Sequence, residues 1–288
     1  MGKTMVSRTL SVHKEHELLL KLETAGLSDE LAQRVIDSKG NDLATKVVRL
    51  IQNGGFDLMS GVDLMIKEKR VREIMGKNFF GVEDWATLYG VNFINKQFSE
   101  VAEFPWNEDV LNAPCPFNKA KSIKETHFAF LGLDSFKGKP LTILEWRKLY
   151  PPPDQPWLRL YYYNKYEHYT CWWAGEKFAE QLTCHFRWYL MPLEIVSNST
   201  DKTYQEQTAM LSQGYEVPLA IEELTKLMLY YRKNGIYLNS EALGRCRDVS
   251  SVGARVHVGF FSSSDLYIGN WRDGEHSSNL GLAVARKF

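Results

Sequence analysis

Residues 255–288 read RVHVGFFSSSDLYIGNWRDGEHSSNLGLAVARKF. Apolar and polar residues alternate in RVHVGF, in DLYIG and in LGLAVARK, a pattern typical of short strands with one buried face. The residues between these runs are Ser, Asp, Gly, Asn, Arg and His around one Trp. The stretch therefore predicts a meander of strands joined by polar loops, with Val256 and Leu266 in the core and Tyr267 on the outer face.

A long helix is predicted just before this meander, in VPLAIEELTKLMLYYRKNG (217–235). Pro218 stands at its start, acidic residues fill its first turns, basic residues its last, and Gly235 follows its end. Apolar residues recur along it at helical spacing, so we expect one face to pack on the rest of the domain. The members of that face are Ile221, Leu224, Leu227, Met228 and Tyr231.

The first part of the chain predicts short helices instead of strands. Ser28 reads as an N-cap, with acidic residues directly after it. Prolines then interrupt the pattern between Phe98 and Phe117, which places a boundary there. We expect a helical unit and linker over 1–117 and an α+β domain over 118–288. The expected helices cover 17–26, 31–40, 42–55, 62–76 and 81–93.

Composition narrows the class of protein. The chain has 288 residues, 44% of them hydrophobic, and 35 basic residues balance 35 acidic ones. Without a basic excess, nucleic acid is not an expected partner. No apolar run is long enough to span a bilayer, and no signal peptide is seen at the N-terminus. Four scattered cysteines without a CxxC pair are typical of a reduced, cytoplasmic protein.

No motif in the sequence indicates catalysis, a resident metal or a cofactor. Cys184 and His185 are adjacent in a predicted strand, where neighbours point to opposite faces, so we do not expect a catalytic dyad. His127, His168 and His257 stand alone. Two alternatives stay open. The aromatic run LRLYYYNKYEHYTCWW (158–173) is either core or a stacking platform. Calcium has possible ligands in Asp265, Asn270, Asp273, Glu275 and Asn279.

Four stretches together resemble a known family: RWYLMPLEIV, YEVPLAIEELTKLMLYYRKNGIYLN, RCRD and VHVGFF…LYIGNW…NLGLAVARKF. They are similar to C-type-lectin-like proteins that are targets of diversity-generating retroelements, and that are related in fold to formylglycine-generating enzymes. The resemblance covers His127 to Phe288 and is strongest from Tyr215 onward. It implies a C-type-lectin-like α+β domain, preceded here by the small helical unit.

The resemblance also implies which residues vary. In that family an error-prone reverse transcriptase replaces adenines near the 3′ end of the gene, so variable codons reach residues such as Asn, Ser, Asp, Gly, Tyr, His and Arg. They do not readily reach Trp or Glu, so Trp271 and Glu275 are expected in the scaffold, with Gly281 and Arg286. The expected ligand-binding side chains, on one solvent face, are Arg247, Asp248, Ser250, Ser251, Ser262, Ser264, Tyr267, Gly269, Asn270, Asp273, Gly274, His276, Ser277 and Asn279.

The implied function is binding of a protein or other surface macromolecule, without catalysis, cofactor, nucleic acid or membrane. Adaptable polar contacts on a rigid scaffold are the physical basis of such surfaces. One alternative is a formylglycine-generating-like oxidoreductase on the same fold, although Cys246 is the only cysteine in the last part of the chain. Another is a structural or interaction domain that is not diversified.

Overall fold

The computed structural model describes residues 11–24, 27–37, 68–93, 101, 103–149, 159–161, 173, 175–263 and 265–287. Contacts divide the chain into two compact units, Met1–Asp57 and Leu58–Phe288. The expected boundary at residue 117 lies inside the second unit. The reason is packing, because Trp85 and Leu111 belong to the same buried cluster as Val256.

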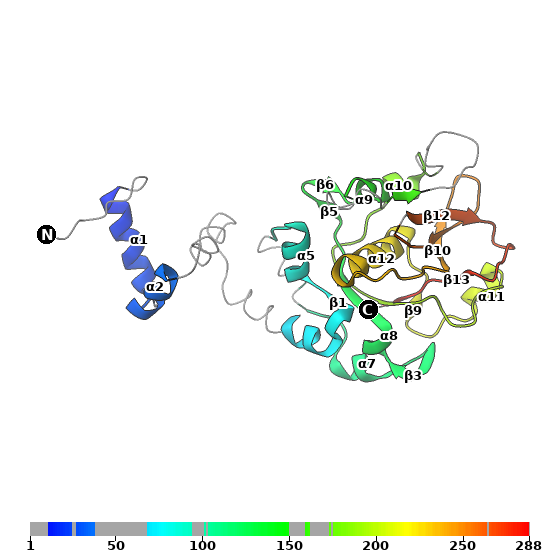
Figure 1. Cartoon of the computed structure of the whole chain (residues 1–288), viewed down its shortest axis with the longest axis horizontal. Coiled ribbons are helices and arrows are strands. Elements are labelled where there is room, and N and C mark those ends of the chain that lie inside the picture. The colour runs from blue at the N-terminus through cyan, green and yellow to red at the C-terminus, as the bar shows by residue number, and fades with distance from the viewer. Residues whose placement is uncertain are drawn as a thin grey trace. The chain divides into compact units, whose positions relative to one another are not determined.

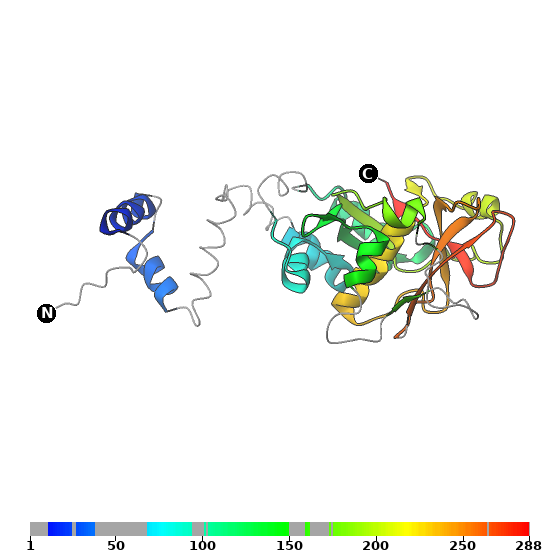
Figure 2. The same ribbon diagram turned by 90° about the horizontal axis from the view of Figure 1, so that it is seen from above.

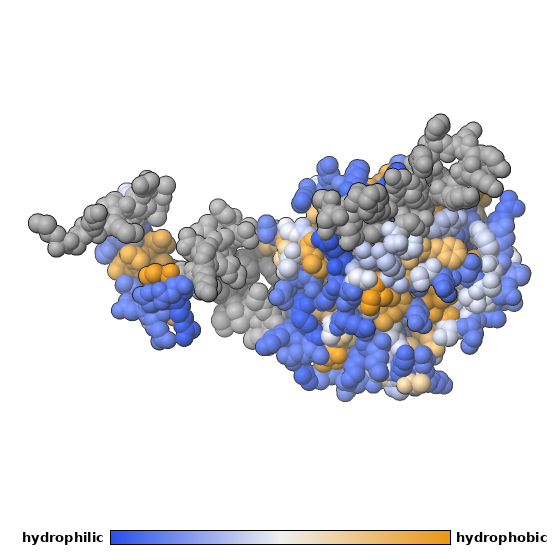
Figure 3. Space-filling model, viewed as in Figure 1, coloured by the Kyte–Doolittle hydropathy of each residue, from blue (hydrophilic) through white to orange (hydrophobic). Residues whose placement is uncertain are grey.

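The first unit contains helix α1 (Val12–Thr24) and helix α2 (Asp29–Ile36). Ser28 Oγ accepts a hydrogen bond from Leu31 N at 3.3 Å, which confirms the predicted N-cap. Apolar side chains are exposed on both helices, as the orange atoms of this unit show (Figure 3). The helix expected over 42–55, like most of the aromatic run, lies outside the described residues.

The second unit is a mixed α+β structure with two main sheets. In the three-stranded sheet, β4 pairs in parallel with β1 and antiparallel with β8. The five-stranded sheet has the order β13-β10-β11-β12-β7, and it contains the predicted antiparallel pair β11-β12. The third strand of the predicted meander, β13, instead pairs in parallel with β10, because the 272–279 connection carries the chain back across the sheet. The strands are β1 (Phe79–Phe80), β4 (His127–Leu131), β7 (Arg159–Tyr161), β8 (Trp188–Pro192), β10 (Leu243–Val249), β11 (Arg255–Gly259), β12 (Asp265–Trp271) and β13 (Leu280–Leu282).

Helix α12 (Ala220–Asn234) lies between these two sheets, in the middle of the unit in both ribbon views (Figures 1 and 2). The sequence predicts a helix with one apolar face, but residues 220–230 are buried on every side. Lys226 and Glu223 form a buried ion pair of 2.8 Å, and Lys226 Nζ also donates to Pro192 O at 2.9 Å. Charged residues of α12 are therefore part of the core.

Short helices and two-stranded ladders surround this centre. The ladder β9-β14 holds the chain end, with Arg286 opposite Tyr215. Among the residues that the structure describes, no helix is both long and apolar enough to cross a membrane. The helices are α5 (Val82–Tyr89), α7 (Glu108–Asn112), α8 (Ile123–Thr126), α9 (Ile143–Leu149), α10 (Lys177–Glu180), α11 (Tyr204–Thr208), helical residues 68–75 and a 3-10 turn (Gly76–Asn78); the ladder strands are β2 (Pro114–Cys115), β3 (Asn118–Ser122), β5 (Ser135–Phe136), β6 (Lys139–Pro140), β9 (Tyr215–Glu216) and β14 (Ala285–Arg286).

The register of the five-stranded sheet fixes what each face presents. Val256, Val258 and Ile268 are fully buried on the face that packs on α12. Paired residues share a face, so His257, which is opposite both Arg245 and Gly269, points to the other side of the sheet. That outer face carries the candidate site.

The backbone at Gly259 lies close to that at Ala242, and this contact gives the first prediction. A Cβ at Gly259 would lie 2.0 Å from the carbonyl oxygen of Ala242, which belongs to the main chain and has no free rotation. We expect Gly259→Ala to lower the free energy of unfolding by about 1–3 kcal/mol, the usual cost of overpacking. Gly274→Ala is the matched control, since no atom lies within 4 Å there. Urea unfolding measures both, and equal midpoints for the two variants would contradict the register.

Candidate functional site

The outer face of the sheet is centred on His257, whose side chain is fully buried. Its ring stacks on Tyr267, with centroids 5.8 Å apart and planes at 27°, and meets Trp271 edge-on at 6.1 Å. A Cβ at Gly269 would lie 2.3 Å from His257 Nε2, so only glycine leaves room for the imidazole. Strands β11 and β12 thus build one aromatic cluster.

The polar groups of this cluster are poorly satisfied. Neither ring nitrogen of His257 has a hydrogen-bond partner in the described part of the chain. Burial, and next the neighbouring Arg245, lower the pKa of His257 to about 3, so the ring is neutral at pH 7.

Arg245 is equally buried, and one of its three guanidinium nitrogens has no hydrogen-bond partner. Its Nη1 donates to Gln207 Oε1 at 3.2 Å and its Nη2 to Glu275 O at 2.6 Å, while Nε has no partner. No carboxylate of the described residues forms an ion pair with Arg245. Burial lowers the pKa of this guanidinium, and the nearby charge of Asp273, followed by Tyr204 and Glu275, acts in the opposite direction.

Residues 272–279, the connection from β12 to β13, cover this pair. Its main chain makes the contacts that hold it: Asp273 O accepts from Tyr204 N at 2.9 Å and Ser277 O from Asp201 N at 2.8 Å. A hollow of about 390 Å³ opens in the connection, lined by Trp271, Gly274, Glu275 and His276. Side-chain pairs flank it, Arg255 with Asp273 at 3.1 Å and His276 with Asp201 at 2.7 Å.

The structure separates the expected ligand-binding side chains instead of bringing all of them to one face. Asp248, Ser250 and Gly269 are buried. Asn270 is opposite Val256, on the face away from Tyr267, and bonds Ser250 Oγ at 3.1 Å. These four belong to the framework because they fill the ends and the interior of the strands. Besides Asn270, which is half-exposed, the positions that stay exposed or half-exposed are Arg247, Ser251, Ser262, Tyr267, Asp273, Gly274, His276, Ser277 and Asn279.

Two ends of the sheet carry these residues. Ser262 follows β11 at the end where Gly259 pairs with Tyr267, whereas the 272–279 connection begins where Arg255 pairs with Trp271. Four residues of strand, roughly 13 Å, separate the two ends. Ser264 lies outside the described residues. Only the 272–279 end therefore forms a continuous candidate surface, together with Ser251.

The expected scaffold residues make structural contacts. Glu275 closes its own turn, accepting from Arg272 N at 2.6 Å through its carboxylate. Gly281 is buried, and a Cβ there would lie 2.4 Å from Ile195 Cδ1. Arg286 lies over the Tyr215 ring at 5.5 Å and donates to its hydroxyl at 3.4 Å. Trp271 is half-buried against His257.

The groups considered for other chemistry do not converge. No cluster of three or more His, Cys, Asp or Glu that could hold a metal occurs among the described residues. Burial raises the pKa of the Cys184 thiol and, strongly, that of Cys246, which keeps both protonated and unreactive. Cys184 precedes β8 and is not part of it; it is buried whereas His185 is exposed.

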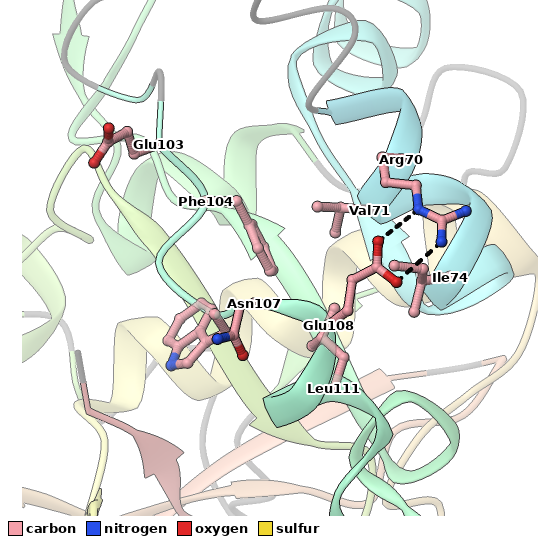
Figure 4. A pocket seen from close by; sticks show the side chains of 9 residues that line it. Arg70, Val71, Ile74, Glu103, Phe104, Asn107, Glu108 and Leu111 are labelled. Carbon is pink, nitrogen blue, oxygen red and sulfur yellow. Dashed lines mark hydrogen bonds and ion pairs between the residues drawn. The ribbon is translucent and has the colours of Figure 1, made fainter.

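A second hollow, of about 400 Å³, lies between helical residues 68–75 and α7 (Figure 4). Phe104, Val71 and Leu111 give it apolar walls, and Arg70 with Glu108 closes one side through two bonds of 2.7 and 2.9 Å. The hydrogen bond to Arg70 lowers the pKa of Glu108. The Arg70–Glu108 pair therefore occupies one side of this hollow, and Glu103 also lines it.

Sequence reasoning missed several residues of the site. Alternation in RVHVGF places Arg255 and His257 together on one face, which was the signal available for the outer cluster. Arg245 belongs to the same cluster, but only the β10-β11 register, which places it opposite His257, shows this. Tyr204 and Asp201 come from the segment before α12, and no sequence pattern links them to the loop. Compared with models of known families, with curated proteins and with solved structures, the chain matches none.

A substitution at Asp248 tests whether this residue belongs to the framework or to the exposed surface. Its Oδ2 accepts from Ala220 N at 2.5 Å, so it caps α12 from a neighbouring strand. We expect Asp248→Ala to lower the free energy of unfolding by about 1–2 kcal/mol, the usual value for a lost cap, and Asp248→Asn, which keeps an acceptor, to lower it less. Ser251→Ala, at an exposed position, is the control. The urea midpoints of the variants measure this. A midpoint for Asp248→Ala that is as high as that of Ser251→Ala would refute the assignment.

Stability should fall with acidification because of two buried histidines. Burial first, and Arg286 or Arg245 next, lower the pKa of His127 and His257 to about 3. The unfolded chain takes up these protons below about pH 6.5 and the folded chain does not, so each histidine removes about 1.4 kcal/mol per pH unit between those values.

The variant His257→Leu should remove one of these two contributions. We expect a shallower fall in the urea midpoint between pH 6.5 and pH 4.5 than in the unchanged chain. His185→Gln, a change at an exposed histidine, is the comparison. An identical pH dependence in His257→Leu and the unchanged chain would show that His257 is not buried and neutral.

Proposed function

We propose that this chain is a non-catalytic ligand-binding protein. Its second unit would be a C-type-lectin-like domain, related in fold to formylglycine-generating enzymes, whose surface at the 272–279 connection is diversified by a retroelement. The partner is a protein or another surface macromolecule. Sequence resemblance motivates this proposal, and the way in which the connection is anchored supports it.

That anchoring is the observation that carries the proposal. Main-chain oxygens of Asp273, Glu275, Ser277 and Asn279 accept hydrogen bonds from Tyr204 N, Arg245 Nη2, Asp201 N and Leu243 N. Main-chain atoms are the same in every residue type apart from proline's missing N–H, so these bonds do not depend on the side chains at the four positions. A connection held in this way keeps its path while its exposed side chains change.

The strands beneath provide the rigid base that such a surface needs. Val256, Val258, Leu266 and Ile268 are at most 1% exposed, in the cluster that includes α12. On the outside, Tyr267 and Trp271 are half-buried aromatic residues among short polar ones. Rigid aromatic anchors with adaptable polar neighbours are the composition of paratopes. We place the variable positions at the exposed residues only, with Asp248, Ser250, Gly269 and Asn270 in the framework.

Two small libraries test this division. One randomises Ser251, Asp273 and His276 to Asn, Ser, Asp, Gly, Tyr, His or Arg, and the other treats Asp248, Ser250 and Gly269 in the same way. We expect most members of the first library to unfold within a few degrees of the unchanged chain, because surface changes rarely exceed about 0.5 kcal/mol. Most members of the second should be insoluble or markedly less stable. Similar melting profiles for the two libraries would end the proposal.

The gene gives the complementary test. A reverse transcriptase and a near-copy of the last coding stretch should lie beside it, and the two copies should differ only where the near-copy has adenine. Differences spread over all four bases would remove the diversification and leave a plain interaction domain. Turnover of a cysteine-bearing peptide in the presence of copper would favour the oxidoreductase instead.

A further inference from the structure

The buried pair beneath the 272–279 connection has nitrogen atoms without a hydrogen-bond partner. Arg245 and His257 are both fully buried and adjacent across β10 and β11, on the outer face of the sheet. Arg245 Nε and both ring nitrogens of His257 have no partner in the described part of the chain. Buried polar groups are nearly always paired, so three such nitrogens on two neighbouring side chains are unusual.

The hollow in the connection lies directly beside this pair. Trp271 lines the hollow, and its ring packs edge-on against the His257 ring, with ring centroids 6.1 Å apart. Glu275 lines it too, and its main-chain oxygen is the group that binds Arg245 Nη2. Arg245 and His257 do not line the hollow themselves, but each contacts a residue that does.

We propose that Arg245 and His257 form a binding site for an oxyanion, a carboxylate or a phosphate, carried on an apolar body that lies against Trp271. The oxyanion pairs with Arg245 and accepts a hydrogen bond from His257, which satisfies the groups that are unpartnered without it. Entry requires the Trp271 side chain to move. This inference rests on the proposed function in so far as both place the ligand at this connection, and it adds that the partner presents an anionic group there.

The surrounding charges set the pH dependence. His257 faces Arg245 on β10, with Tyr267 on β12 beside it and Arg255 two residues away on β11. The connection places Asp273, Glu275 and His276 nearby, and α11 contributes its first residue, Tyr204. An anion between Arg245 and His257 favours protonation of the imidazole, so binding takes up a proton and becomes stronger as the pH falls.

The test uses the full chain and benzoate as the probe, with phenyl phosphate as the second oxyanion and benzamide as the neutral match. Binding is followed by the ring nitrogen signals of ¹⁵N-histidine-labelled protein, with His257 assigned by its absence in His257→Leu. We expect benzoate, but not benzamide, to shift the His257 signals, and more strongly at pH 6 than at pH 8. A larger response to phenyl phosphate identifies a phosphate site, and a larger response to benzoate a carboxylate site.

Variants locate the binding. Arg245→Met and His257→Leu should each weaken benzoate binding about tenfold or more, the usual value of a charge-assisted hydrogen bond, measured by calorimetry. Arg272→Met removes an exposed arginine of the same connection and should leave the affinity within about twofold. Equal shifts of the His257 signals by benzoate and benzamide in the unchanged chain would overturn the site, whatever the variants do.

Loss of binding in Arg272→Met with binding kept in Arg245→Met would overturn it as well, because the anion would then lie on the surface. The result is separate from the proposed function. A chain whose exposed positions tolerate randomisation but which does not respond to benzoate refutes the anion site alone. A chain that binds benzoate but whose exposed library fails to fold refutes the diversified surface alone.

Discussion

The fold of the second unit depends on the burial of charged residues in α12. Lys226 joins Glu223 and the Pro192 carbonyl, which ties the helix to the end of β8. Glu223 also accepts from Asn239 at 3.0 Å and lies 3.2 Å from where a Cβ of Gly244 would stand. One ion pair thus connects the two sheets through the helix between them, and breaking one partner would leave an uncompensated charge in the core.

This position of α12 explains how the outer face of the five-stranded sheet can be irregular. Its inner face is fixed by apolar packing on the helix, so the strand register does not depend on contacts outside. The outer face can then hold an unpartnered histidine and an arginine with one unpartnered nitrogen, at a cost in stability that the core offsets. Strain of this kind is typical of sites that bind something, because a partner relieves it.

Periodicity predicted the elements well where the core decides them. The β11-β12 hairpin, the cap at Ser28 and the helix from Ala220 all followed from spacing and end signals, whereas the parallel pairing of β13 with β10 did not. The burial of Glu223 and Lys226 did not, because partners such as Pro192 O and Asn239 are set by tertiary contacts. The polar stretch was harder still. Asp248 and Ser277 are equally compatible with a turn or a surface, and only the fold shows that one is a helix cap and the other is half-exposed.

The ladder β9-β14 has a consequence for any gene that is rewritten near its 3′ end. Arg286 pairs with Tyr215 at the close of the chain, and Trp106 Nε1 donates to Lys287 O at 3.3 Å. A copying error that shifts the reading frame within the polar stretch would replace every residue after it, including β13 and β14. Such a chain would lose the strands that join residues 285–287 to the core, whereas substitutions confined to residues 272–279 leave the ladder unchanged.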